Sequence, residues 1–203
     1  MYLHLWEAFG DDAIGDKAIE LVISVYKKLH QEFGDTRNRI EHFGLPTNDH
    51  IKQVADFSFV TVPQPIFIDE LGENFIQALD EDFLRQCYPI KSLIQKNIPV
   101  AFSTDAPVVK NINPWSCIKS AITRRTNAGN FISKHESVSI EESLHAYTLG
   151  SAFAEGTESK KGSLEKNKFA DFQVVNKNPM TVEIEELESI CCEEVYVDGE
   201  KVK

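Results

Sequence analysis

The sequence predicts an α/β protein with a parallel sheet, followed by a small all-β piece at the C-terminus. Three observations favour this fold class. Strand-like and helical stretches alternate at least three times, which is typical of βαβ units. His42, Gln64 and Asp105 each end a predicted strand, at the edge where α/β proteins hold their chemistry. Beyond about residue 160 the sequence becomes rich in turn residues and short strands.

The first third of the chain contains a helix between polar segments. Residues 2–6 have a strand pattern that Glu7 to Asp12 interrupts. A helix begins near Asp16, carries apolar residues at helical spacing and ends by Gly34. A short strand loaded with polar groups follows within residues 37–46.

The middle of the chain repeats the strand–helix pattern. Residues 47–57 predict a helix with Thr47 or Asn48 as N-cap. Residues 59–65 predict a β-branched strand that two prolines close. Helical sequence fills residues 69–96 with a break near Tyr88, and residues 99–102 predict a short, fully buried strand.

The last third begins with helices and ends in strands. A helix follows Pro114, and a second begins at Ser139 with a capping-box pattern and leads to Gly150, where a further short helix starts. The composition changes near residues 155–165, so we expect a boundary there, with domains at 1–160 and 161–203. Strands are expected at 172–176 and 194–198, and Asp198-Gly199 is a hairpin-turn signal.

Composition excludes several classes of function. The formal net charge of −11 argues against a nucleic-acid or anionic-membrane partner. No apolar run is long enough to span a membrane, and the N-terminus lacks the pattern of a signal peptide. The four cysteines lack metal-type spacing, so we interpret them as free, buried small hydrophobes in a cytoplasmic protein. They are Cys87, Cys117, Cys191 and Cys192.

Asp105 is the first candidate for chemistry, because a carboxylate at the C-terminal end of a buried parallel strand lies where barrels and open sheets build their sites. The alternative is that Asp105 caps the following turn, as Asp often does. In a β/α barrel, His42 and Asp105 would lie on the same rim and approach one another.

Four segments carry a resemblance to a known family. They are Asp12-Ala-Ile-Gly-Asp-Lys-Ala18, Arg39-Ile-Glu-His42, Ser103-Thr-Asp-Ala-Pro107, and Lys161-Gly-Ser-Leu-Glu165 with Ala170-Asp171-Phe172. Thr123-Arg-Arg125 and Ala146-Tyr-Thr148 add agreement. In this order and spacing, the chain resembles the amidohydrolase superfamily, and within it the amidohydrolase family 3 type of metal-dependent hydrolase.

The resemblance implies the C-terminal part of a (β/α)8 TIM barrel, strands five to eight, with the returning strands of a small β-sandwich. It implies zinc or another divalent metal and a small amide-type substrate with a non-peptide carbon–nitrogen bond. Asp105 would be the general acid/base and a metal ligand, with His42 as a second ligand. Arg39 and Glu41 would orient these ligands, or alternatively form a structural ion pair.

The chain departs from the family pattern near its N-terminus. The family has a His-x-His pair on its first strand, and this chain contains no counterpart. Asp12 stands where the family has a strand-five histidine and can ligate a metal, with His4 as the alternative. Two functions therefore stay open: a hydrolase, or a catalytically incomplete fragment that serves in interaction. A missing N-terminal half or a second copy of the chain would complete the barrel. An open α/β sheet with an unrelated ligand is a third possibility.

Overall fold

The computed structural model describes residues 10–203, so residues 2–6 and the alternative ligand His4 lie outside the described residues. Strand β1 (Gly10–Ala13) leads into helix α1 (Asp16–Phe33), and β2 (Arg39–His42) leads into α2 (Asn48–Asp56). Strand β3 (Val60–Val62) then closes a three-stranded parallel sheet in the order β1-β2-β3. Three parallel strands in sequential order occur both in a barrel and in one half of a doubly wound sheet.

The expectation that Glu7 to Asp12 breaks regular structure is wrong for Gly10 to Asp12, which form most of β1. Gly10 pairs with Arg39 and Ala13 with His42 in a parallel register. Gly-Asp-Asp carries no apolar signal, but the backbone of any residue can pair in a sheet, and Ala13 is fully buried. Strand β1 therefore forms at residues whose side-chain pattern does not predict a strand.

The predicted strand at residues 99–102 is present only as a single parallel bridge between Thr61 and Val100. Thr61 donates its N–H to the Pro99 carbonyl, Ala101 donates to the Thr61 carbonyl, and Ser103 donates to the Pro63 carbonyl. The next bond of this ladder is missing because Pro63 has no N–H to donate. The segment is extended and buried as expected, but too weakly paired to count as a strand.

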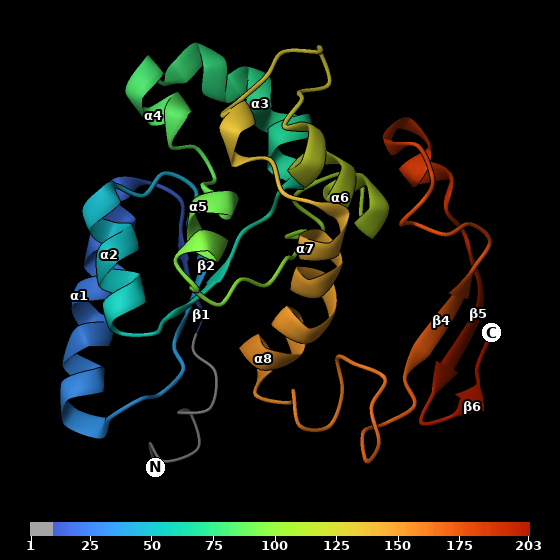
Figure 1. Ribbon diagram of the computed structural model, residues 1–203. Coiled ribbons are helices and arrows are strands. Elements are labelled where there is room, and N and C mark those ends of the chain that lie inside the picture. Colours follow the sequence, from blue (N-terminus) through green and yellow to red (C-terminus); the bar gives the residue numbers. More distant parts are fainter. Residues whose placement is uncertain (1–9) are drawn as a thin grey trace.

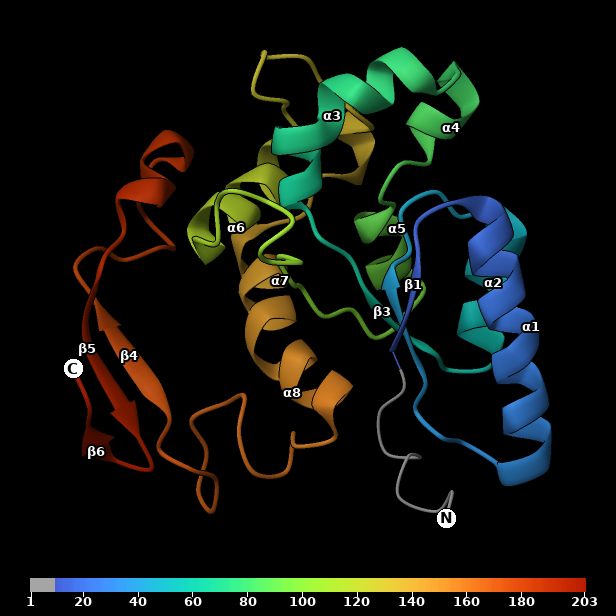
Figure 2. The same ribbon diagram turned by 180° about the vertical axis from the view of Figure 1, so that it is seen from behind.

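Helices surround the parallel sheet. Figures 1 and 2 show α1 and α2 on one side of it, and α7 (Ile140–His145) and α8 (Ser151–Glu155) on the other. The region expected to be helical between 69 and 96 forms three helices, with a second break after Ala78 that the sequence did not predict. They are α3 (Ile66–Ala78), α4 (Glu81–Arg85) and α5 (Ile90–Gln95).

Two predicted helix caps are confirmed. The Thr47 hydroxyl accepts a hydrogen bond from the His50 N–H, and Nδ1 of the His50 ring accepts one from the Thr47 N–H, which completes a capping box at α2. Ser139 and Glu142 form the expected capping box at α7. Helix α6 (Pro114–Thr123) has Asn113 as its N-cap, and a 3₁₀ turn, η1 (Lys134–Glu136), precedes α7.

The expected helix from Ser139 to Gly150 contains a π segment, η2 (Ala146–Gly150), between α7 and α8. A π turn shifts the hydrogen bonds of the helix by one residue, so a carbonyl can turn outward. The Ala146 carbonyl accepts the N–H of Phe102, which anchors this helix to the buried 99–102 segment. Gly150 lies against the same segment: a Cβ on it would stand 2.3 Å from the Val100 carbonyl oxygen.

The C-terminal strands are confirmed as an antiparallel sheet, β4-β5-β6. They are β4 (Phe172–Val175), β5 (Cys192–Val197) and β6 (Glu200–Lys201). Asp198 and Gly199 have φ values of 51° and 81°, as a two-residue hairpin turn requires. A 3₁₀ helix, η3 (Ile184–Ser189), follows β4 and buries Leu187 against α6.

The main core lies between the parallel sheet and its helices, and includes Ile19, Ile23, Ile40, Phe43, Ile66 and Leu93. Arg124 is the largest fully buried side chain. Cys87 and Cys117 are buried as expected, but Cys191 is exposed and Cys192 is half-buried. These two lie at or just before the start of β5, a strand that buries none of its residues fully. No helix within residues 10–203 is long and apolar enough to cross a membrane.

Candidate functional site

His42 ends β2 and lies almost completely buried, with 5 % of its surface exposed. His42 and Phe43 both have positive φ values, 65° and 47°, so the chain turns sharply as the strand ends. The imidazole ring packs beside the Phe67 ring, with centroids 5.5 Å apart. Its Nδ1 atom has no hydrogen-bond partner among residues 10–203, so only the Nε2 side of the ring engages other polar groups.

Two carboxylates face that Nε2 atom. Asp12 of β1 approaches it through Oδ1 at 3.7 Å, and Asp105 approaches it through Oδ2 at 3.9 Å. Asp12 reaches this position because β1 pairs with β2 in register, with Ala13 opposite His42. Asp105 follows the 99–102 segment in the left-handed conformation, with φ 60°. The structure therefore brings together Asp12, His42 and Asp105, whose roles the sequence could only suggest.

Arg39 and Glu41 lie side by side on β2, with Arg39 Nε 3.0 Å from Glu41 Oε1. Burial raises the pKa of the Glu41 carboxyl above its ordinary value. The nearby Asp12 and Asp105 carboxylates raise it further, while Arg39 opposes them. The ion pair that the sequence offered as an alternative is thus present, next to the three candidate residues.

Gln64 belongs to the same edge of the sheet. It is buried, and its side-chain amide donates to the Val62 carbonyl and to the Ser103 hydroxyl, both at 2.8 Å. Ser103 lies two residues before Asp105, so Gln64 links the end of β3 to the segment that carries the carboxylate. The sequence placed Gln64 at a strand end but did not predict this linking contact.

The arrangement fits part of a metal site. Zinc holds nitrogen and oxygen ligands at about 2.0–2.2 Å, so two atoms on one ion lie at most about 4.3 Å apart. Both distances from His42 Nε2 fall inside that limit. However, the described part of the chain contains no group of three or more His, Cys, Asp or Glu side chains that could hold an ion together. His42, Asp105 and Asp12 therefore fit as an incomplete set of ligands.

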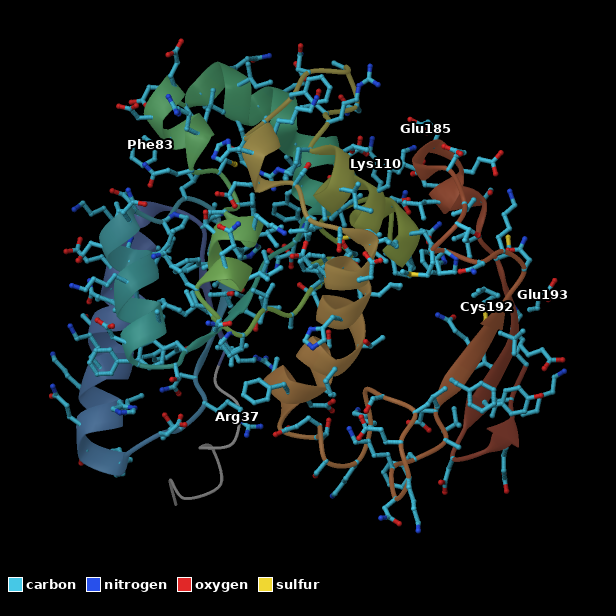
Figure 3. All side chains as sticks on the ribbon, in the orientation of Figure 1. Arg37, Phe83, Lys110, Glu185, Cys192 and Glu193 are labelled. Carbon is cyan, nitrogen blue, oxygen red and sulfur yellow. The ribbon has the colours of Figure 1, made fainter. Side chains whose placement is uncertain are left out.

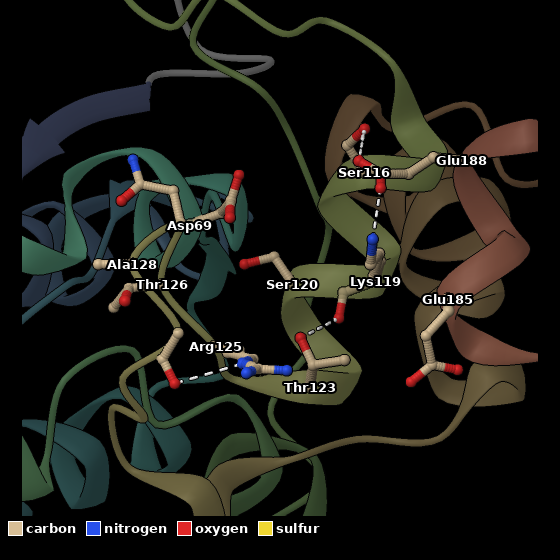
Figure 4. Close-up of a pocket in the computed structure, with 12 residues that line it drawn as sticks. Asp69, Ser116, Lys119, Ser120, Thr123, Arg125, Thr126, Ala128, Glu185 and Glu188 are labelled. Carbon is tan, nitrogen blue, oxygen red and sulfur yellow. Dashed lines mark hydrogen bonds and ion pairs between the residues drawn. The ribbon is translucent and has the colours of Figure 1, made fainter.

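One cavity of the described structure lies away from the candidate site. A space of about 510 Å³ opens between α3, α6 and η3, lined among others by Asp69, Lys119 and Glu188. Figure 4 shows Lys119 and Glu188 pointing toward one another, as their ion pair requires. Burial raises the pKa of Asp69. None of Asp12, His42 and Asp105 lines this cavity, so it plays no part in the candidate site.

Comparison with known proteins identifies the chain. The model of a family described as the amidohydrolase family matches residues 12–203. The chain belongs to the amidohydrolase family. The matched region contains every candidate side chain that the structure describes, from Asp12 to Asp105.

Individual relatives of this chain are much longer. An N-substituted formamide deformylase from Arthrobacter pascens is 28 % identical over 189 residues, which cover 92 % of this chain and 34 % of that protein. The protein LONG AFTER FAR-RED 3 from Arabidopsis thaliana is 28 % identical over 170 residues, covering 82 % of this chain and 29 % of that protein. The chain therefore spans about a third of the length of these curated relatives.

A solved structure agrees with the fold. The metal-dependent hydrolase from Pyrococcus horikoshii OT3 superposes with a TM-score of 0.75 at 26 % identity. The superposition covers 87 % of this chain and 35 % of that structure. The α/β fold of this amidohydrolase, with its parallel sheet and small antiparallel sheet, thus matches part of a larger hydrolase fold.

Proposed function

We propose that this chain is part of a metal-dependent hydrolase of non-peptide carbon–nitrogen bonds, with a small amide-type substrate. The observation that carries the proposal is the approach of both Asp12 and Asp105 to His42 Nε2. Membership of the amidohydrolase family supports the reaction class. The formamide deformylase among the relatives suggests N-substituted formamides as the first substrates to try.

On this proposal the parallel strands and the 99–102 segment are strands five to eight of a (β/α)8 barrel. Residues 1–160 form the partial barrel domain, and residues 161–203 are the returning strands of a small composite β-sandwich. The match to about a third of the P. horikoshii hydrolase supports this assignment. On this proposal, either a further segment of chain or a second copy of this one completes the barrel. The free thiols are consistent with a cytoplasmic protein.

His42, Asp105 and Asp12 would hold the metal. Zinc is the expected ion, because it binds imidazole and carboxylate ligands well. A bound zinc ion lowers the pKa of its water and polarises the substrate carbonyl. Asp105 accepts the proton of the attacking water on a carboxylate oxygen while the water oxygen bonds to the carbonyl carbon. Asp105 then gives this proton to the leaving nitrogen as the carbon–nitrogen bond breaks. Arg39 and Glu41, paired on the same strand as His42, orient the ligands.

A second candidate function is a catalytically incomplete fragment that serves in interaction. One observation favours it: residues 10–203 contain no group of three or more potential metal ligands. A catalytic zinc needs about three protein ligands and an open position for water.

Hydrolysis of N-substituted formamides by the full-length natural protein separates these functions. We expect Asp105→Asn to lower kcat by at least about 100-fold, because an amide cannot accept the proton of water. Asp56→Asn, at the exposed end of α2, is the matched control and should leave turnover unchanged. Unchanged turnover in Asp105→Asn would refute the role of Asp105, and no turnover by the natural protein would favour the second function.

A further inference from the structure

The loop at residues 103–113 carries Asp105 and is held on its N-terminal side by the contacts of Ser103. The Ser103 N–H donates to the Pro63 carbonyl, and its hydroxyl accepts from Gln64. Asp105 itself stands in a tight turn, where its carbonyl accepts the Val108 N–H at 2.9 Å. Fixing Asp105 beside His42 therefore requires a second anchor after this turn.

Glu70 of α3 provides that anchor. Its Oε2 accepts the Lys110 N–H at 3.0 Å, and its Oε1 accepts the Asn111 N–H at 2.9 Å. Hydrogen bonds to an ionised carboxylate are stronger than neutral ones, and both oxygens are used here. Lys110 lies beside α6 in Figure 3. The loop between Ser103 and Asn111 is thus pinned at both ends.

Two further contacts close the loop around this anchor. Val109 is buried in the main core, directly before the two clamped N–H groups. The Asn111 side chain donates to the Ser116 hydroxyl at 2.7 Å and accepts the Asn113 N–H at 2.9 Å. These contacts hold the clamped segment from its own side, and among the hydrogen bonds of residues 10–203 those to Glu70 join it to α3.

We propose that Glu70 is a positioning residue whose carboxylate holds the 103–113 loop so that Asp105 stays next to His42. This inference rests on the proposed role of Asp105 in catalysis. Glu70 acts through the backbone of Lys110 and Asn111, and nothing in its contacts places it on substrate or metal. Loss of the clamp frees the loop between Val109 and Asp105, and the Asp105 carboxylate then samples positions away from the imidazole.

The same helix offers a matched control. Glu73, one turn further along α3, accepts hydrogen bonds from the Thr126 hydroxyl at 2.5 Å and from the Asn130 side chain at 3.0 Å. These bonds lower the pKa of Glu73 below its ordinary value. Glu73 therefore clamps a different turn, 126–130, by the same chemistry. A general weakening of α3 would affect both turns, whereas the proposed clamp affects only the Asp105 loop.

The test compares Glu70→Ala, Glu70→Gln and Glu73→Ala in the 203-residue chain by amide hydrogen exchange and by NMR. We expect the Lys110 and Asn111 amides to exchange at least about tenfold faster in Glu70→Ala, which corresponds to about 1.4 kcal/mol. Glu70→Gln retains one acceptor and the shape of the side chain, so its effect should be intermediate. The resonances of Asp105 and His42 should shift in both Glu70 variants, and in Glu73→Ala the changes should fall at 126–130.

In the natural protein, the Glu70 variants should lower kcat and leave KM for N-substituted formamides within about twofold, as expected when only the transition state is affected. Unchanged exchange at Lys110 and Asn111, or Asp105 shifts of equal size in Glu73→Ala, would overturn the clamp. Absence of turnover by the natural wild-type protein refutes the proposed function instead, and the exchange contrast between Glu70 and Glu73 still decides the clamp.

Discussion

The Nε2 atom of His42 lies 3.9 Å from the Oδ2 atom of Asp105, although the two residues follow different segments of the parallel sheet. An imidazole nitrogen and a carboxylate oxygen at this distance are too far apart for a direct hydrogen bond. Both atoms are of the kinds that ligate zinc, so the two residues would be able to hold one cation between them. The geometry therefore suits a shared cation better than a direct His–Asp contact.

Zinc titration of the 203-residue chain by calorimetry tests this interpretation. We expect binding weaker than micromolar, because the ligand set is incomplete and metal affinity depends on a preformed site. His42→Ala and Asp105→Asn should each weaken it at least about tenfold further. His145→Ala, at an exposed position on α7, is the control. Tight stoichiometric zinc together with turnover by this chain alone would contradict the expectation.

Gly150→Ala should destabilise the protein, although alanine is the better helix former by about 0.5–1 kcal/mol. The new Cβ would stand 2.3 Å from the Val100 carbonyl oxygen, a backbone atom that cannot move aside cheaply. We expect a loss of at least about 2 kcal/mol in urea unfolding. Gly15→Ala is the control, because nothing lies within 4 Å of the Cβ that it would add. Equal stability of the two variants would refute the close approach of η2 to residue 100.

Arg124→Met should cost about 3 kcal/mol or more in unfolding free energy. The guanidinium is fully buried and donates to the carbonyls of Ile132, Tyr88 and Cys87. Burial lowers the pKa of Arg124 to about 10, so the group remains charged at neutral pH. Methionine fills similar space but donates to none of these carbonyls. The Tyr88 carbonyl still accepts the Ile90 N–H, whereas the Ile132 and Cys87 carbonyls lose their bonds.

Arg125→Met is the neighbouring control for this change. Its exposed guanidinium makes one hydrogen bond to the Gly129 carbonyl, so we expect a loss below about 1 kcal/mol. Because Arg124 fixes the backbone at Cys87 and Tyr88, its loss should also speed hydrogen exchange there. A cost for Arg124→Met no larger than that of the control would show that the buried contacts contribute little.

Stability should fall as the pH rises from about 9 to 10. Burial raises the pKa of Cys87 and of Cys117 to about 12, from ordinary values near 9. Between pH 9 and 10 the unfolded chain therefore loses thiol protons that the native protein keeps. This lowers the free energy of unfolding by about 2 kcal/mol across that pH unit. Above pH 10 the lowered pKa of Arg124 works in the opposite direction.

Urea unfolding at pH 8, 9 and 10 measures this effect. The double variant Cys87→Ala/Cys117→Ala should have a flatter pH profile, although it is less stable throughout because two buried side chains shrink. Cys191→Ala is the control, since that thiol is exposed. A wild-type profile as flat as that of the double variant would show that the buried thiols do not cause the loss of stability at high pH.

Sequence patterning predicted the position of His42 because β2 and its following turn carry a recognisable tetrapeptide at a strand end. It missed β1, since Gly-Asp-Asp pairs through its backbone and shows no apolar alternation. It overestimated the strand at 99–102, where Pro63 has no N–H to continue the ladder although residues 100–102 are buried. Backbone donors, rather than hydrophobicity, decided both cases.

The contacts around Asp105 were beyond prediction for a different reason. In the sequence, Glu70 has the pattern of an ordinary exposed helix residue. Its partners are backbone N–H groups of a distant loop, and the residue types in that loop do not indicate such a contact. The left-handed conformation of Asp105 likewise has no signal beyond the tolerance of Asp for that region. The sequence therefore predicts Asp105 as a candidate carboxylate but not the contacts that hold its loop.

The π segment at η2 has a consequence for insertions and deletions in this region. A π turn accommodates one residue more than a regular helix, and each residue of a helix advances the side chains by about 100°. Deleting the exposed Thr148 would let the helix run on regularly, and α8 would rotate by that angle. Ala152 and Ala154, now buried, would turn away from their neighbours. The extra residue of the π turn thus determines which side chains of α8 face the core.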